Sequence, residues 1–308
     1  VSGQELNNYD PIKYEFVNQT DLYKNYVQGK GDDWFRNQAS NDIKMMFSNL
    51  RMSKLLTIYI IFESLRDGLI SLDTEFKVST NAWKKKGSRM FLEVGSMVSV
   101  SDLLKGIIVQ SGNDACIVIA EGLSGDEDTF ADKMNKVAKK IGLTNSNFTN
   151  STGWPDKNHY MSARDLGVLS RKLILDFLKF LYLFSEKSFS YNNIKQGNRN
   201  PLLYSYSFSD GLKTGHTEAS GYGLTSTALK NNRRLILVLN GMNSKKERKE
   251  ESVKLFKWAY REFVNIDLFS PKEPILQADV WLGKNDLVSL ISNNTIKVTI
   301  AKDTLKDF

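Results

Sequence analysis

Two short stretches of this 308-residue chain combine residue types that could bind a peptide and move a proton. Ser111-Gly112-Asn113 places a hydroxyl that can pass a proton beside an amide that can hydrogen-bond a substrate's peptide group. Lys213-Thr214-Gly215 places an ammonium and a hydroxyl that can hold a carboxylate beside a glycine that lets a substrate backbone approach closely. Each triplet alone is common, but the two in this order, about 100 residues apart, form a much more specific pattern.

The cysteine and histidine content gives no basis for metal or disulfide chemistry. The chain has one cysteine, Cys116, and two histidines, His159 and His216. A single cysteine cannot form an internal disulfide, and it lacks the companions of a zinc site. Cys116 could supply a thiol nucleophile, but it lies in the apolar run CIVIA, where a free cysteine is usually buried packing. We therefore expect no metal and no cofactor.

Composition indicates an ordinary globular protein, with 41% hydrophobic and 25% charged residues. The net charge of +7 comes from lysines and arginines spread along the chain rather than gathered into a stripe with aromatic residues, so we expect no nucleic-acid partner. A basic surface would tolerate an anionic neighbour such as a cell wall or lipid headgroups. No run approaches the roughly 18 apolar residues of a membrane span, and no secretion signal opens the chain.

The elements around the first triplet can be predicted from periodicity and capping. Lys54–Arg66 is apolar on nearly every face and predicts a buried central helix with a stop near Gly68. Met97–Val100 predicts a short strand, Ser101 an N-cap, and Asp102–Val109 a helix that runs into the triplet. A further helix should follow it.

The second triplet lies ahead of a predicted hairpin, at an expected edge strand. Gly221–Leu229 and Arg234–Asn240, joined through Asn231-Asn232, indicate two antiparallel strands. Upstream, Ser162 with Asp165 predicts a capped helix start. A helix should follow the hairpin, with one apolar side formed by Val253, Phe256, Tyr260 and Phe263. Strands beside helices in this order predict an α+β fold.

Both ends of the chain differ in character from its middle. Residues 1–50 show no sustained period of 2 or 3.6. Around Asn265–Pro274 the pattern changes to proline and polar residues, followed by short alternating stretches at Asp279–Leu282 and Thr295–Ile300 that predict strands. A second, all-β domain should start there, and with roughly 35 residues left it should be cut short.

Most of the chain, from about Met52 to Phe263, resembles the low-molecular-weight penicillin-binding D-alanyl-D-alanine carboxypeptidases. The most specific stretches are GSRMFLEVG (87–95), SGNDACIVIAE (111–121), MSARDLG (161–167), DGLKTGHTEASGYGLTSTA (210–228) and ERKEESVKLFKWAYREF (247–263). The resemblance implies three segments. They are an atypical front that does not match the family (1–51), a β-lactamase- or transpeptidase-like domain with an antiparallel sheet flanked by helices (52–264), and a truncated small C-terminal β-domain (265–308).

The family's reaction is acyl transfer. A serine attacks the carbonyl of the terminal D-Ala-D-Ala bond of a peptidoglycan stem peptide, D-alanine leaves, and the acyl-enzyme is hydrolysed. The resemblance implies that Lys54, the lysine of the family's Ser-x-x-Lys motif, takes the serine's proton. Ser111 would then relay a proton to the leaving amine, and Asn113 would hold the peptide.

The resemblance assigns substrate binding to the second triplet and the residue after it. Lys213 and Thr214 would bind the terminal carboxylate, with Gly215 beside them, and the backbone N–H of His216 would form half of an oxyanion hole. The implied partners are stem peptides ending in D-Ala-D-Ala, β-lactams that mimic them, and a membrane surface reached through a C-terminal helix that this sequence does not contain. The implied location is the periplasm, facing the cytoplasmic membrane, in peptidoglycan synthesis, cell wall biogenesis and maintenance of cell shape.

The sequence departs from the family at the nucleophile. Aligning Lys54 without a gap puts Arg51 where the family has its serine, and an arginine cannot form an acyl-enzyme. Ser53 is adjacent to Lys54 and corresponds to a family position that is not the nucleophile. Ser48 would require another helix register, with Arg51 in place of the base. We expect neither serine to replace the nucleophile.

Three alternatives stay open, two of them interpretations of this departure and one a rival function. The first 50 residues could come from another reading frame or a decayed gene. The chain could instead be a natural pseudoenzyme that still binds peptidoglycan or β-lactams. A β-lactamase of the same fold is a third, but it would need a deacylating carboxylate between the two triplets, and neither Asp156 nor Glu186 has a supporting motif.

Overall fold

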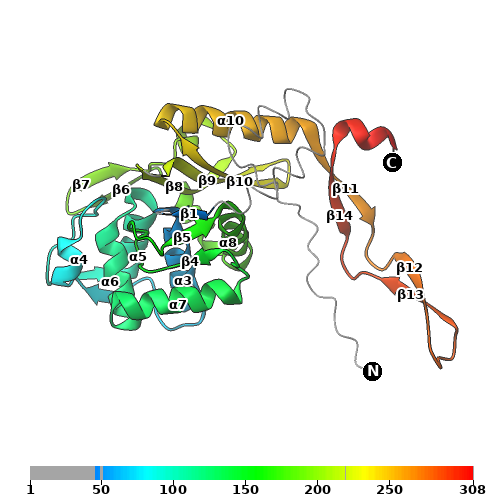
Figure 1. Ribbon diagram of the computed structural model, residues 1–308, viewed down its shortest axis with the longest axis horizontal. Helices are drawn as coiled ribbons and strands as arrows, with labels where there is room; N and C mark the ends of the chain where they lie inside the picture. Colours follow the sequence, from blue (N-terminus) through cyan, green and yellow to red (C-terminus); the bar gives the residue numbers. More distant parts are fainter. Residues whose placement is uncertain (1–45, 49–50, 219, 308) are drawn as a thin grey trace. The chain divides into compact units, whose positions relative to one another are not determined.

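A computed structural model describes residues 46–48, 51–218 and 220–307, so the expectations for most of the first 50 residues lie outside the described residues (Figure 1). The described residues up to Lys254 form one compact unit, and those from Leu255 onward form another. Within the part of the chain that is described, no helix is long and apolar enough to cross a membrane.

A buried helix, α3 (Lys54–Arg66), forms the centre of the first unit, as predicted. Leucine, isoleucine and phenylalanine occupy nearly all its faces, so packing on every side removes apolar surface from water. Phe62 stacks on Phe180 and meets Phe177 edge to face. The helix stops at Gly68, whose φ of 72° is readily adopted only by glycine. A single 3-10 turn, η1 (Arg51–Ser53), leads into it.

The first triplet lies between two helical segments, as expected. The strand β3 (Met97–Ser99) is followed by α5 (Val100–Lys105) and then by a π-helical turn, η2 (Gly106–Gln110). The predicted N-cap at Ser101 is wrong, because the Ser99 side chain accepts a hydrogen bond from the Asp102 N–H at 3.1 Å and starts the helix two residues earlier. After Ser111 and Gly112 the chain enters α6 (Asn113–Ser124).

The other elements of the helical region are short, apart from α7 and α8. The cap at α8 is confirmed, since the Ser162 Oγ accepts from the Asp165 N–H at 3.1 Å. The bounds are β1 (Met46–Ser48), β2 (Glu75–Lys77), α4 (Thr80–Lys84), α7 (Glu127–Lys140), β4 (Ser146–Asn147), β5 (Tyr160–Ser162), α8 (Ala163–Asp176), η3 (Leu178–Ser185), β6 (Ser188–Tyr191), β7 (Ile194–Gly197) and α9 (Leu202–Ser205).

A three-stranded antiparallel sheet carries the second triplet. Its order is β10 (Arg233–Met242), β9 (Gly221–Lys230) and β8 (Ser209–Thr217), so β8 is an edge strand, as predicted. Asn231 and Asn232 both have positive φ, which suits the two-residue turn expected between β9 and β10. The helix α10 (Lys245–Glu262) follows the sheet.

The second unit contains two strand pairs, which agrees with the predicted small β-domain. The strand β11 (Phe263–Phe269) pairs with β14 (Ile296–Ala301), and β12 (Pro274–Asp279) pairs with β13 (Leu287–Ile291), before a 3-10 segment, η4 (Lys302–Asp307).

Two details of the prediction near the second unit are wrong. Phe263 begins β11 instead of lying on the helix, because it pairs with Ala301. A strand is also expected at Asp279–Leu282, but the observed strand β12 ends at Asp279, the last residue that pairs with β13. Beyond it, Leu282 has a left-handed φ of 56°, which does not fit a strand. The strand expected at Thr295–Ile300 is present as β14.

Candidate active site

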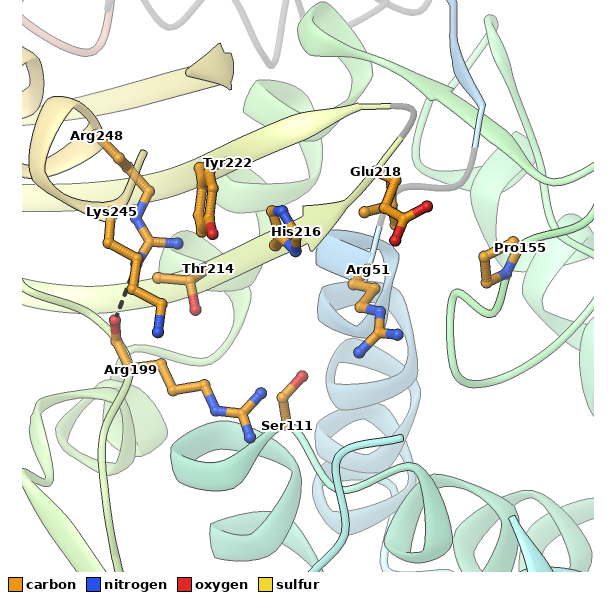
Figure 2. Close-up of a pocket in the computed structure, with 12 residues that line it drawn as sticks. Arg51, Ser111, Pro155, Arg199, Thr214, His216, Glu218, Tyr222, Lys245 and Arg248 are labelled. Atoms are coloured by element: carbon orange, nitrogen blue, oxygen red, sulfur yellow. Dashed lines mark hydrogen bonds between the residues drawn. The ribbon is translucent and has the colours of Figure 1, made fainter. Parts of the chain in front are cut away.

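A cleft of about 910 Å³ lies between the edge strand β8, the turn η1 and the start of α6 (Figure 2). Residues of both triplets line it, although about 100 residues separate the triplets along the chain. Its lining residues are Arg51, Ser111, Pro155, Arg199, Thr214, Gly215, His216, Thr217, Glu218, Tyr222, Lys245 and Arg248.

Lys54 lies fully buried at the start of α3, next to Asn113. Its Nζ donates to Asn113 Oδ1 at 2.8 Å and to the carbonyl oxygen of Thr152. The Asn113 amide in turn donates to the Lys86 carbonyl at 2.8 Å. Burial, and to a smaller extent the positive charge of Arg51, lowers the pKa of Lys54 to about 8. A lysine in this state is partly neutral near physiological pH and can accept a proton.

Ser111 points into the cleft from the break between η2 and α6 (Figure 2). Its φ of 61° and ψ of 36° are left-handed, a conformation that is uncommon for serine. The π-helical turn before it and the Gly112 N–H bond to the Gly106 carbonyl at 3.0 Å hold it there. Non-helical backbone at this point presents the hydroxyl to a ligand instead of to the preceding turn.

The edge strand β8 presents Thr214, Gly215 and His216 to the cleft. Because no strand pairs with this edge in the described sheet, an extended peptide could hydrogen-bond along it. Lys213 is buried beneath, and burial followed by the charge of Lys54 holds its pKa well below the usual value. Gly215 has a second reason to be glycine, since a Cβ there would lie 2.9 Å from Met52 Cγ.

Arg51 occupies the position three residues before Lys54, and its guanidinium extends into the cleft (Figure 2). The guanidinium carbon lies 5.6 Å from the centroid of the Trp154 ring. Its Nε is buried without a hydrogen-bond partner, and burial lowers its pKa. The position three residues before Lys54, in the turn η1, therefore carries no hydroxyl or thiol.

The two serines near Arg51 have other surroundings. Ser53 is fully buried, and its Oγ lies 2.9 Å from His159 Nε2. The other ring nitrogen of His159 accepts from the Thr149 N–H at 3.2 Å, so the proton resides on Nε2, and burial lowers the pKa of this histidine to about 4. His159 therefore donates to Ser53 and cannot act as its base. Ser48 belongs to β1, opposite Tyr160, so it does not precede Arg51 on a helix.

Cys116 is buried in α6, as the packing interpretation predicted. Burial raises the pKa of its thiol to about 12. A thiol in this state stays protonated and is a poor nucleophile. Among the described residues, no group of three histidine, cysteine, aspartate or glutamate side chains is placed to hold a metal ion.

Sequence reasoning missed several cations that line the cleft. Arg199 donates to Ser88 Oγ at 2.6 Å, while Arg248 lies over the Tyr222 ring and donates to the backbone carbonyl of Arg199 at 3.4 Å. Lys245 completes the set. No short motif marks these residues, because they come from a loop and from the start of α10. Only the fold gathers them.

Comparison with known proteins agrees with the resemblance seen in the sequence. A family model described as D-alanyl-D-alanine carboxypeptidase matches residues 39–245, a range that includes Arg51 and starts upstream of the boundary expected at residue 52. The chain is 38% identical to D-alanyl-D-alanine carboxypeptidase DacA of Haemophilus influenzae over 82% of this chain and 65% of that protein. It is 37% identical to DacC of Escherichia coli, over 83% and 66%. The chain thus spans just under two thirds of these relatives.

Solved structures show the same fold. Penicillin-binding protein 5 from Haemophilus influenzae superposes with a TM-score of 0.80 at 35% identity, covering 86% of this chain and 78% of that one. Penicillin-binding protein D2 from Listeria monocytogenes, solved with ampicillin bound, gives a TM-score of 0.65 at 25% identity over 71% of this chain and 89% of that one.

Proposed function

Because this chain belongs to the D-alanyl-D-alanine carboxypeptidase family, we propose that its cleft binds the D-Ala-D-Ala end of peptidoglycan stem peptides and the β-lactams that mimic it. One observation carries the proposal. Ser111 and Thr214 line a single cleft, and the buried pair of Lys54 and Asn113 is joined by a 2.8 Å hydrogen bond, although these residues come from three distant parts of the chain. We place this function outside the cytoplasmic membrane, in peptidoglycan synthesis.

In the proposed complex the peptide lies along the free edge of β8. Thr214 and Lys213 hold the terminal carboxylate, and the cations around them favour a negative end of the peptide. The His216 backbone N–H faces the carbonyl of the last peptide bond, and Asn113 holds the peptide from the other side. Ser111 and Lys54 form the route by which a proton would reach a leaving amine.

Acyl transfer is the family's reaction, and Arg51 removes its first step from this chain. A guanidinium stays protonated and has no free pair with which to attack a carbonyl. We therefore propose that this protein binds the peptide without cleaving it. Serine-type carboxypeptidase activity, which is a form of proteolysis, is the reaction of the family, but this chain does not perform it.

The test is intact mass after incubation with a penicillin, together with calorimetric titration of Nα,Nε-diacetyl-L-Lys-D-Ala-D-Ala. Saturable peptide binding without a covalent adduct supports the proposal. An adduct mapped to Ser48, Ser53, Ser111 or Cys116 would replace it with an active enzyme. A folded protein that binds neither ligand would overturn it.

A β-lactamase is the competing function, and the same samples test it. Neither Asp156 nor Glu186 lines the cleft, and Glu218 is the one carboxylate among its lining residues in the described part of the chain. Rapid, catalytic hydrolysis of a chromogenic cephalosporin would favour the β-lactamase over a binding protein.

A further inference from the structure

Arg51 is a half-buried cation whose guanidinium has no described anionic partner. Its Nε is buried without a hydrogen-bond partner among the described residues, and the guanidinium carbon lies over the ring of Trp154. Within the described part of the chain Arg51 forms no ion pair. A desolvated cation of this kind gains most from an anion that can reach it.

The surrounding charge points to the same kind of ligand. Among the described residues, four cations line the cleft, Arg51, Arg199, Lys245 and Arg248, against one carboxylate, that of Glu218. Arg51 and Arg199 extend toward the space beside Ser111 from opposite sides (Figure 2). Two positive groups that face the same space repel each other, and in agreement burial and then the charge of Arg51 lower the pKa of Arg199. An anion between them would relieve that repulsion.

The chemistry of a stem peptide decides which anion fits. An attacking serine must lie about 3 to 3.5 Å from the carbonyl it attacks, so the group at that position adjoins the bond that the family cleaves. In a peptide ending in D-Ala-D-Ala this bond is a neutral amide. In a peptide that has already lost its last D-alanine, the same carbon belongs to the terminal carboxylate. This carboxylate lies one residue, about 3.6 Å, before the position of the terminal carboxylate of the longer peptide.

We infer that Arg51 converts the nucleophile position into a carboxylate site, so that this cleft selects stem peptides already trimmed to a single terminal D-alanine. The inference rests on the proposed function, because it assumes that the cleft binds stem peptides. A planar guanidinium can hold both oxygens of the new carboxylate, with Arg199 opposite, whereas an amide offers one acceptor and no charge. The longer peptide must also pass the guanidinium to place its carboxylate at Thr214.

Calorimetric titration of three probes tests the inference on the unmodified chain. The probes are Nα,Nε-diacetyl-L-Lys-D-Ala, the same compound with a C-terminal amide, and the longer Nα,Nε-diacetyl-L-Lys-D-Ala-D-Ala. We expect the short acid to bind about tenfold more tightly than the longer peptide, because charge-assisted hydrogen bonds are roughly twice as strong as neutral ones. The amide should lose that preference.

The variant Arg51→Gln removes the guanidinium and so measures its contribution to binding apart from that of the other cleft residues. It should bind the longer peptide at least as well as the short acid, while Arg66→Gln, at the other end of α3, should keep the original order. If Arg51→Gln does not fold, the comparison of the short acid with the longer peptide on the unmodified chain still decides.

The outcomes distinguish the two proposals. Equal binding of the short acid and the longer peptide, or tighter binding of the longer one, overturns the selection by Arg51 and leaves the proposed function standing. Binding of none of the three probes overturns the proposed function itself.

Discussion

Replacing Arg51 with serine should restore acylation by β-lactams. The substitution Arg51→Ser recreates the Ser-x-x-Lys spacing with Lys54, which already lies buried at the start of α3 and bonded to Asn113. The rest of the cleft needs no change, because Ser111 and the edge of β8 already face it. We expect a penicillin adduct of one molecule per chain on the variant and none on the unmodified protein.

The pH dependence follows from the pKa of Lys54. With a pKa of about 8, roughly one fifth of Lys54 is neutral at pH 7.4, and only the neutral form can take the serine's proton. Removing the Arg51 charge removes one of the influences that lower this pKa, so the midpoint in Arg51→Ser should lie at pH 8 or somewhat higher. Acylation should therefore rise with pH through that range and then level off.

The assay is intact mass against time at several pH values, with peptide mapping of the adduct. The double variant Arg51→Ser/Lys54→Ala should acylate about 10²- to 10⁴-fold more slowly, which is the usual contribution of a general base. Arg66→Ser is the matched control, since it removes an arginine from the far end of the same helix. A folded Arg51→Ser that forms no adduct, or an adduct whose rate ignores pH, would refute the reasoning.

Three further outcomes follow from the structure. Thr214→Val keeps the shape of the β8 edge but removes the hydroxyl. Calorimetry should therefore show that stem-peptide binding is weakened about fivefold, a loss of ~1 kcal/mol in binding free energy. Unchanged affinity would contradict the role of Thr214. Asp114→Ala should lower the free energy of unfolding in urea by about 3 kcal/mol or more, because this buried carboxylate accepts the N–H groups of Met90 and Phe91. The change Asp126→Ala at an exposed helix cap should lower it much less, and equal losses would count against this account. Cys116 should react with a thiol reagent only after unfolding, and rapid labelling of the folded protein at neutral pH would show that its thiol is not buried as described.

Local features of the sequence predicted the parts of the fold that depend on neighbouring residues. The apolar run at Lys54–Arg66, the Ser162 cap and the Asn231-Asn232 turn were each placed correctly, because helix burial, capping and tight turns follow from side chains a few residues apart. The errors at Ser101 and Phe263 fall at the ends of elements. There, hydrogen bonds to Asp102 and to a distant strand outweigh local preference.

The sequence alone also determined the two triplets and the arginine three residues before Lys54, since these depend only on residue type and order. Only the tertiary structure decided what surrounds them. Burial lowers the pKa of Lys54 to about 8, because the cost of desolvating a charge depends on packing from all directions. Arg199 and Arg248 line the cleft but come from segments without a recognisable motif. The positive charge of the cleft depends on how close these side chains lie in space, and their spacing along the chain does not specify that distance.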